Sequence, residues 1–338
     1  MVDSLIDTIG KTHIIKLKNP RIFSKLEFTN PFGMKDRFAK YVIEKALREG
    51  NLEKNGVIIE SSSGTFALGL ALVGSFYGIE THIVTDPRID KITLAKLKGL
   101  GAKVHVVESM NNQGWQGARL QKLYDLLDIF GNKAFWPMQY TNLENRESYA
   151  SLAEDLIKLN KPINFLVAAI GSGGSLSGTA KCVKEVFPEC KVVAVDCVGS
   201  ILFGQEDNPT RLQGGLGNSL IPANINYEII DMVHWLNDSE AFSATLDLVK
   251  NEQIFAGNSS GSVYWVSRFL ANQYKDANIF SIMADRGDRY FDTIYDSQYW
   301  LENKIEKIDF EQVVPKKINN INECDNKWNY IFWNGGSR

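Results

Sequence analysis

The chain has 338 residues, with 37 Lys and Arg against 40 Asp and Glu, so its formal net charge is −3. This length suffices for one large domain or two interlocked domains with a substantial core. The charge balance leaves no basic surface to hold nucleic acid, and no apolar run reaches the ~18 residues that a membrane span needs.

The first predicted helix follows a glycine-bearing turn. Residues 30–37 read Asn-Pro-Phe-Gly-Met-Lys-Asp-Arg, and apolar residues then recur at three and four positions over 38–46. Lys35 would sit at the helix N-terminus, where the positive end of the dipole disfavours its ammonium form. A lysine that loses its proton easily can form a Schiff base. For the Lys-Asp-Arg triplet alone, a solvated lysine in a polar turn is the commoner case.

Strands and helices then alternate in two series. The first series has expected strands at residues 57–60, 82–85 and 104–107 and helices at 64–77 and 91–100. The second has expected strands at residues 165–170, 192–196 and 279–283 and helices at 175–186, 239–250 and 260–273. Alternation with continuous apolar strands predicts an α/β fold of two interlocked parallel-sheet domains with helices on both faces.

A hydroxyl-rich loop follows the strand expected at residues 57–60. Its Ser62, Ser63, Gly64 and Thr65 could grip a carboxylate with hydroxyls and exposed N–H groups, although serines also serve as ordinary helix caps. Gln139 lies at a further strand end and could donate its amide to the same carboxylate.

A glycine-rich loop follows the strand expected at residues 165–170 and opens a helix. It consists of Gly171, Ser172, Gly173, Gly174 and Ser175. Backbone N–H groups in such a loop can converge on an anion, assisted by the helix dipole and the hydroxyls. The loop lacks the lysine of a Walker loop and the spacing of Gly-x-Gly-x-x-Gly, so a phosphate monoester suits it better than a nucleotide. Alone it is a weak indication, because many strand–helix turns are glycine-rich for steric reasons.

The cysteines and the start of the chain indicate a cytoplasmic protein. Residues 1–7 carry acids where a signal peptide would carry Lys or Arg. Cysteines occur at positions without paired spacing, namely Cys182, Cys190, Cys197 and Cys324. We therefore expect free thiols in a reducing cytosol, with no metal site and no disulfide framework.

In this order, the lysine turn, the hydroxyl loop, the glutamine and the glycine loop resemble fold type II pyridoxal-phosphate enzymes. The resemblance is strongest to the cysteine synthase and cystathionine β-synthase group and runs from about residue 7 to residue 300. It implies a fold like the tryptophan synthase β-subunit, pyridoxal 5′-phosphate as cofactor, small amino-acid substrates and a homodimer.

The resemblance also assigns roles to residues. Lys35 matches the Schiff-base lysine, and residues 171–175 match the phosphate loop. The substrate carboxylate loop matches residues 62–65, with Gln139 as a further contact, and residues 215–217 resemble a glycine segment that moves with substrate.

From these roles we expect three parts. Residues 1–40 and 146–305 would form a large cofactor-binding domain, and residues 41–145 a smaller, mobile substrate-loop domain. Residues 306–338 are too aromatic for a solvated tail, so we expect them to dock on the body or on a partner subunit.

The chain departs from the family pattern at three places. The lysine motif is one residue shorter, and Thr65 replaces the asparagine that usually donates to the cofactor's 3′-oxygen. Asp285 takes the place of the serine that usually meets the pyridine nitrogen. Asp285 could hold that nitrogen protonated, or Arg286 could keep it neutral, and both alternatives stay open.

The implied reaction is β-replacement on an O-activated L-serine, either O-acetylserine or O-phosphoserine, through an aminoacrylate. Residues 285–290 also resemble the branch that makes 2,3-diaminopropionate precursors, where an amine attacks. A β-eliminating lyase is a further alternative. A catalytically silent regulatory subunit is the non-enzyme alternative, against which Lys35 and the phosphate loop argue. Arg119 or Arg146 could meet a phosphate or a second carboxylate, although a surface salt bridge is the commoner role.

Overall fold

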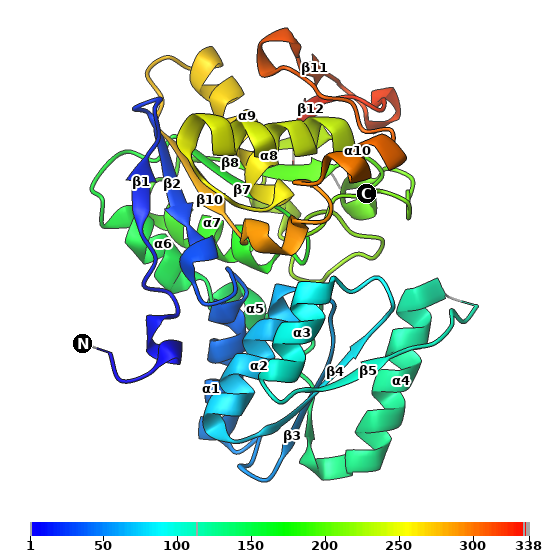
Figure 1. The fold of residues 1–338 in the computed structure, drawn as a ribbon. Coiled ribbons are helices and arrows are strands. Elements are labelled where there is room, and N and C mark those ends of the chain that lie inside the picture. The colour runs from blue at the N-terminus through cyan, green and yellow to red at the C-terminus, as the bar shows by residue number, and fades with distance from the viewer. Residues whose placement is uncertain (1, 113, 334, 336–338) are drawn as a thin grey trace. The chain divides into compact units, whose positions relative to one another are not determined.

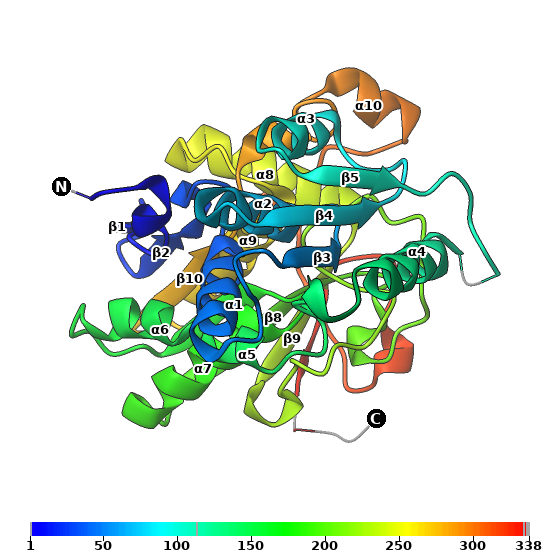
Figure 2. The same ribbon diagram turned by 90° about the horizontal axis from the view of Figure 1, so that it is seen from below.

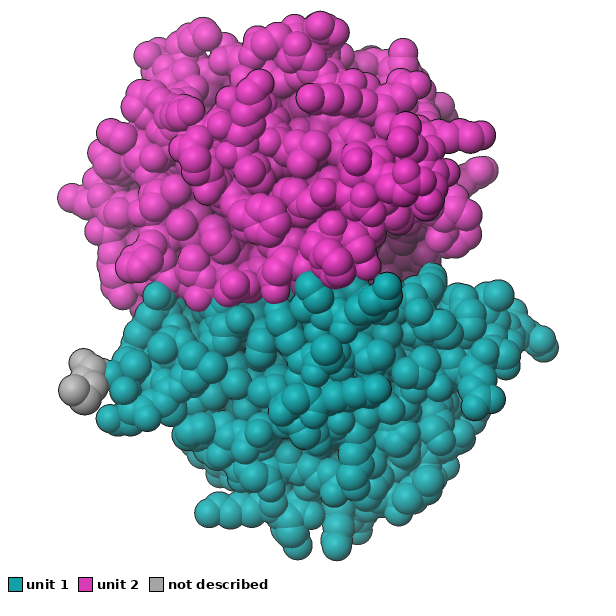
Figure 3. All heavy atoms as spheres, in the orientation of Figure 1, with its two compact units in different colours: residues 1–11, 30–144 teal, residues 12–29, 145–338 magenta. Residues whose placement is uncertain are grey.

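The protein forms two compact units. The computed structural model describes residues 2–112, 114–333 and 335. Unit 1 comprises Met1–Lys11 and Asn30–Glu144, and unit 2 comprises Thr12–Thr29 and Asn145–Arg338, as Figure 3 colours them. The expected division put residues 1–40 in the larger domain, whereas residues 1–11 and 30–40 belong here to the smaller unit. Arg37 and Asn30 fix this arrangement, because Arg37 Nη2 donates to Gly10 O (3.0 Å) and Gly10 N donates to Asn30 Oδ1 (2.7 Å).

Unit 1 is built on a four-stranded parallel sheet of order β5-β4-β3-β6. Its strands are β3 (Val57–Ser61), β4 (Glu80–Thr85), β5 (Lys103–Val106) and β6 (Ala134–Phe135). Its helices are α1 (Asp36–Glu49), α2 (Thr65–Tyr77), α3 (Lys91–Gly99) and α4 (Gly114–Phe130). Helices α2 and α3 cover one face of the sheet and α4 covers the other (Figures 1 and 2). Because α2 packs between the sheet and α1, it is apolar on nearly every side.

Unit 2 is built on an eight-stranded sheet of order β1-β2-β10-β7-β8-β9-β12-β11. Its strands are β1 (Ile14–Lys16), β2 (Ile22–Leu26), β7 (Phe165–Ala169), β8 (Lys191–Cys197), β9 (Met232–Leu236), β10 (Ile279–Met283), β11 (Lys316–Lys317) and β12 (Asn329–Phe332). The five central strands, from β2 to β9, run parallel, whereas β1 and β12 are antiparallel to their neighbours.

Helices cover both faces of the unit 2 sheet. They are α5 (Glu144–Glu147), α6 (Ala150–Ile157), α7 (Gly174–Val186), α8 (Asp238–Glu252), α9 (Asn258–Gln273) and α10 (Ser297–Glu302). The pair α8 and α9 packs on one face, and α6 and α7 lie on the other (Figure 1). The predicted α/β class with two parallel sheets is therefore confirmed, and the antiparallel edge strands are an addition to it.

The last part of the chain belongs to the unit 2 sheet. Strand β12 pairs antiparallel with β9, and Trp328, just before it, is buried against Trp265. The Trp328 indole N–H donates to His234 Nδ1 (3.0 Å). Burial lowers the pKa of His234 to about 3, so this imidazole is neutral and can accept.

The described helices include none that is both long and apolar enough to cross a membrane.

Candidate functional site

Lys35 lies at the N-cap of α1, where it is half-buried. The preceding turn passes through Gly33 at φ +147 and is held by the buried carboxylate of Asp36. Asp36 Oδ2 accepts from the N–H groups of Phe32 (2.7 Å) and Gly33 (3.2 Å). Asp36 and Arg37 thus build the turn and anchor the N-terminal segment. Of the Lys-Asp-Arg triplet, Lys35 is therefore the candidate for forming a Schiff base, because it lies at the start of the helix.

The hydroxyl loop lies between the end of β3 and the start of α2. Ser62 and Thr65 are buried, and Ser63 is half-buried. Helix α2 has Gly64, which carries no side chain, as its N-cap residue. Ser62 Oγ accepts from the Gly64 N–H at 3.5 Å. The first N–H groups of the helix itself can receive an anion.

Glu60 joins this loop to the segment that carries Gln139. Its Oε1 accepts from the N–H of Ser61 (2.7 Å) and from the Trp136 indole (3.2 Å), while Oε2 accepts from the N–H of Gln139 (3.3 Å). Gln139 Nε2 also donates to Ser61 O (3.4 Å). Complete burial raises the pKa of Glu60 to about 7. One buried carboxyl group therefore brings together the two segments predicted to contact a substrate carboxylate.

The sequence analysis did not predict Glu60 as a site residue, although the sequence contained a signal that it is buried. It is an acid at the end of the apolar run Val57–Ser61, where a buried carboxyl group needs several hydrogen bonds to be tolerated. Apart from the adjacent Ser61 N–H, the donors that satisfy it lie more than 70 residues further along the chain, so sequence spacing did not point to them.

The two candidate arginines have different surroundings. Arg119, on α4, donates through Nη1 to Ser63 Oγ (2.8 Å) and lies 3.3 Å from Asp86 Oδ2. Arg146 donates to the backbone carbonyls of residues 223–225 and so fastens that segment. Only Arg119 touches a predicted site residue.

The glycine loop of unit 2 connects β7 to α7. Gly173 is the N-cap at φ +83, and a Cβ there would lie 2.5 Å from Ile225 Cγ1. Steric exclusion of any larger residue therefore explains the glycine at this position. A Cβ on Gly171 would meet no atom closer than Gly215 O at 3.5 Å. The cap has no side-chain hydrogen bond, and within the described residues the hydroxyls of Ser172 and Ser175 have no hydrogen-bond partner. N–H groups and hydroxyls at this helix start can therefore receive a phosphate monoester.

Asp285 lies buried just after β10. Its carboxylate accepts from Ser259 Oγ (3.2 Å) and from the Tyr290 hydroxyl (2.6 Å). A Cβ on Gly215 would lie 3.8 Å from Asp285 Oδ2, so the 215–217 segment lies beside both this carboxylate and Gly171. Arg286 is exposed and pairs with Asp288 (3.2 Å). Asp285 is therefore the better candidate for the group that faces a pyridine nitrogen.

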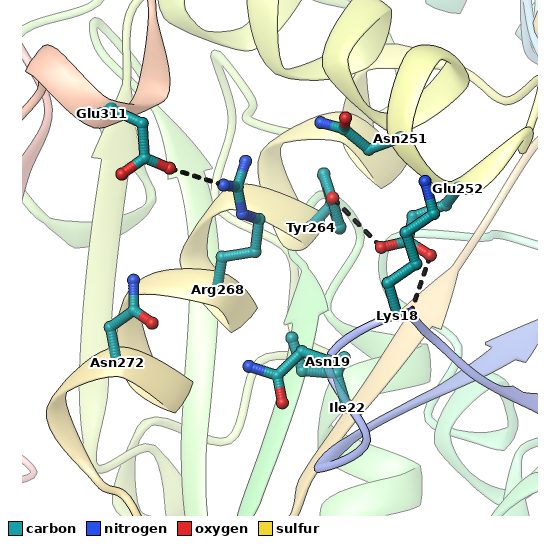
Figure 4. Close-up of a pocket in the computed structure, with 9 residues that line it drawn as sticks. All are labelled: Lys18, Asn19, Ile22, Asn251, Glu252, Tyr264, Arg268, Asn272 and Glu311. Atoms are coloured by element: carbon teal, nitrogen blue, oxygen red, sulfur yellow. Dashed lines mark hydrogen bonds and ion pairs between the residues drawn. The ribbon is translucent and has the colours of Figure 1, made fainter.

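A separate pocket of about 470 Å³ in unit 2 contains none of these residues. It is lined by Lys18, Asn19, Ile22, Asn251, Glu252, Tyr264, Arg268, Asn272 and Glu311 (Figure 4). Three of its charged groups already have partners, because Arg268 pairs with Asp247 (2.6 Å) and Glu311 (2.8 Å) and Glu252 accepts from Tyr264 (3.2 Å). We therefore do not assign the candidate site to this pocket.

The fold and the two candidate anion-binding loops agree with a pyridoxal-phosphate enzyme, and comparison with known families shows this class. The family described as "Pyridoxal-phosphate dependent enzyme" matches residues 5–285, and the chain belongs to it.

Solved structures of related enzymes share the fold over most of the chain. The O-acetylserine-dependent cystathionine β-synthase from Helicobacter pylori is 29% identical, with a TM-score of 0.81 over 88% of this chain and 99% of its own. A hydrogen sulfide-producing enzyme from Fusobacterium nucleatum is also 29% identical, with a TM-score of 0.78 over 86% and 100%. O-acetylserine sulfhydrylase isoform 3 from Entamoeba histolytica is 26% identical, with a TM-score of 0.82 over 92% and 95%.

The residues present fit this cofactor. The start of α7, capped by a glycine without a side chain, and the hydroxyls of Ser172 and Ser175 suit its phosphate. The buried carboxylate of Asp285 suits a pyridine nitrogen. Both features lie in unit 2, on either side of Gly215.

Proposed function

We propose that this enzyme catalyses β-replacement on an O-activated L-serine, with O-acetylserine or O-phosphoserine as the donor. The observation that carries the proposal is the joining of the hydroxyl loop and Gln139 by Glu60. This arrangement offers a substrate carboxylate several hydrogen-bond donors at the carboxyl end of a parallel strand, where ligands bind in open α/β sheets. The O-acetylserine-dependent relatives support the choice of donor.

Each candidate residue has a defined task in this proposal. When bound, pyridoxal phosphate supplies the electron sink that stabilises negative charge at the substrate α-carbon. Residues 171–175 hold its phosphate, Lys35 Nζ holds its aldehyde carbon, Thr65 donates to its 3′-oxygen, and Asp285 meets its pyridine nitrogen. Ser62, Ser63, the Gly64 N–H and Gln139 hold the substrate carboxylate. The substrate amine would take the place of Lys35 Nζ, and the amine of Lys35 released in this way would accept the α-proton as general base.

The proposal extends to assembly and location. The unpaired cysteines support a location in the reducing cytoplasm. Family resemblance supports a homodimer with a smaller domain that moves when substrate binds. Light scattering coupled to size-exclusion chromatography would test the dimer directly. A monomeric mass for the active enzyme would contradict it.

Product analysis tests the reaction itself. The holoenzyme would be incubated with O-acetyl-L-serine or O-phospho-L-serine and with sulfide, homocysteine or an α-amino acid amine, and the products identified by mass spectrometry. Cysteine or cystathionine would support the leading proposal. A diaminopropionate derivative would instead assign the chain to the amine-using branch, and pyruvate alone to a β-eliminating lyase. No turnover and no retained cofactor would identify a catalytically silent subunit.

A further inference from the structure

A charged cluster lies directly behind the hydroxyl loop of unit 1. Arg119 Nη1 donates to Ser63 Oγ at 2.8 Å, and the side chain is only 17% exposed. Its Nε is buried and has no hydrogen-bond partner within the described residues. Surface solubility does not explain why Arg119 is largely buried against the proposed carboxylate loop with one N–H group lacking an acceptor.

The cluster carries more positive than negative charge. The buried carboxylate of Asp86 already accepts from Arg88 in a two-pronged arrangement, with Nε–Oδ1 and Nη2–Oδ2 both 2.9 Å. Burial alone would raise the pKa of Asp86, but the hydrogen bonds from Arg88 and the charge of Arg119 outweigh it and lower that pKa. One ionised carboxylate therefore faces two guanidinium groups, and the excess positive charge lies on the Arg119 side, next to Ser63.

Arg119 also restricts how the Ser63 hydroxyl can point. A guanidinium group only donates, so Ser63 Oγ must accept from it. Ser63 Oγ lies 2.8 Å from Thr85 Oγ1, and either hydroxyl could be the donor in this bond. Thr85 is fully buried, and its hydroxyl has no other acceptor among the described residues, so its proton is satisfied when it donates to the second lone pair of Ser63. With both lone pairs used, the single Ser63 proton points to a third acceptor. A substrate carboxylate is an acceptor of the right charge.

We infer that Arg119, held by Asp86, is a positioning residue that makes Ser63 a hydrogen-bond donor and selects substrates with a free α-carboxylate. This inference rests on the proposed function, since it concerns the carboxylate contact of Ser63. It predicts that the enzyme binds amino acids far better than the corresponding amides, and that this preference depends on Arg119.

The test is a binding titration of the holoenzyme, followed by the visible absorption of its bound cofactor. L-serine and L-serinamide would be compared in the wild type, in Arg119→Met, and in Lys122→Met, which removes a positive charge from the same helix without touching the loop. We expect Arg119→Met to weaken L-serine binding by about 10- to 100-fold and L-serinamide binding by at most about twofold. Lys122→Met should leave both affinities unchanged.

Two further variants separate positioning from a folding defect. Arg119→Lys keeps the charge and should restore part of the L-serine affinity. Ser63→Ala should make the Arg119→Met change largely silent, because both substitutions remove the same contact.

Three outcomes would overturn the inference. An unchanged serine-to-serinamide ratio in Arg119→Met would do so while the proposed function stands. Selective loss of O-phosphoserine binding, with L-serine unaffected, would assign Arg119 to the leaving group instead. A wild-type holoenzyme that binds no serine derivative would contradict both the inference and the proposed function.

Discussion

The two loops that we propose to bind anions, one in each unit, are built from different chemical groups. The proposed phosphate loop of unit 2 offers backbone N–H groups and hydroxyls at the start of α7, and its Gly173 fits closely against Ile225. The hydroxyl loop of unit 1 is braced by ionisable side chains, namely Glu60, which accepts from the Ser61 N–H, and Arg119, which contacts both Ser63 and Asp86.

This difference matches what each loop must do. A cofactor phosphate stays bound through many turnovers, so a loop with fixed backbone donors is sufficient. A substrate carboxylate must be bound and released in every cycle and distinguished from uncharged analogues. Charged braces that orient hydroxyls serve this purpose, because charge-assisted hydrogen bonds are stronger and more selective than neutral ones.

The largest expected effect is a loss of activity in a unit 1 variant that still retains the cofactor through unit 2. Lys35→Ala removes the proposed base and leaves the phosphate loop intact, so activity should fall by about 10²- to 10⁴-fold. Pyridoxal phosphate should still bind, but reduction with borohydride should no longer attach it to the chain. Peptide mass spectrometry of the reduced protein measures this attachment. Wild-type activity in the variant would remove Lys35 from the mechanism.

The next effect concerns the buried carboxyl group that braces the hydroxyl loop. Burial raises the pKa of Glu60 from 4.5 to about 7, so the folded protein binds more protons than the unfolded chain between these values. The stabilising contribution of Glu60 is complete below pH 4.5 and is lost as the pH rises through about 7. It amounts to about 3 kcal/mol. Glu60→Gln should remove this part of the pH dependence in urea unfolding.

A matched variant in unit 2 sharpens this prediction. Glu240 accepts from the N–H of Asn237 in the capping box of α8, and burial raises its pKa to about 7 as well. Glu240→Gln should therefore flatten the same pH range of the free energy of unfolding. Only Glu60→Gln should also raise KM for the serine donor. Equal effects of the two variants on KM would show that Glu60 does not organise the carboxylate site.

A third prediction addresses the backbone-built loop. Gly173→Ala places a Cβ against Ile225 at φ +83, which should cost about 1 to 3 kcal/mol and weaken cofactor binding. Cofactor titration followed by absorption, together with thermal unfolding, measures both. Gly99→Ala is the control, since no atom lies within 4 Å of its added Cβ. Unchanged cofactor affinity in Gly173→Ala would argue against a tightly fitted phosphate loop.

The smallest effect is expected at the proposed pyridine contact. Tyr290→Phe removes the 2.6 Å hydrogen bond to Asp285 and should lower the free energy of unfolding by about 1 kcal/mol. It should also change the visible spectrum of the bound cofactor. Tyr295→Phe removes a bond of the same length to Ala256 O and should cost similar stability. If the two variants had the same spectrum, Asp285 would not be the group at the pyridine nitrogen.

The sequence predicted the parts of the molecule that short-range patterns determine. The apolar runs that became β3, β4, β5, β7, β8 and β10 and the helices α2, α3, α7, α8 and α9 were located within a few residues. Lys35 was correctly expected at the start of a helix, because apolar periodicity and a glycine turn meet there. The short strands β1 and β6 were missed, since three residues or fewer carry too little periodicity to be recognised. The longer strands β2 and β9 and helix α4 were missed as well.

The contacts that Glu60 and Arg119 make with the site could not be predicted from sequence spacing, for a physical reason. Glu60 and Gln139 are 79 residues apart, and Arg119 and Ser63 are 56 apart, so only the folded sheet brings them together. The sequence offered Arg119 and Arg146 as equal candidates. The contact of Arg119 with Ser63, against the carbonyl contacts of Arg146, distinguished them.

Hydrogen–deuterium exchange of the holoenzyme, with and without saturating L-serine, tests most directly the claim that unit 1 recognises the substrate carboxylate. We predict new protection in the peptides covering residues 60–66 and 136–140, while residues 171–175 are already protected by the cofactor and change little. Substrate-induced protection confined to residues 171–175 would contradict the claim and move substrate recognition to unit 2.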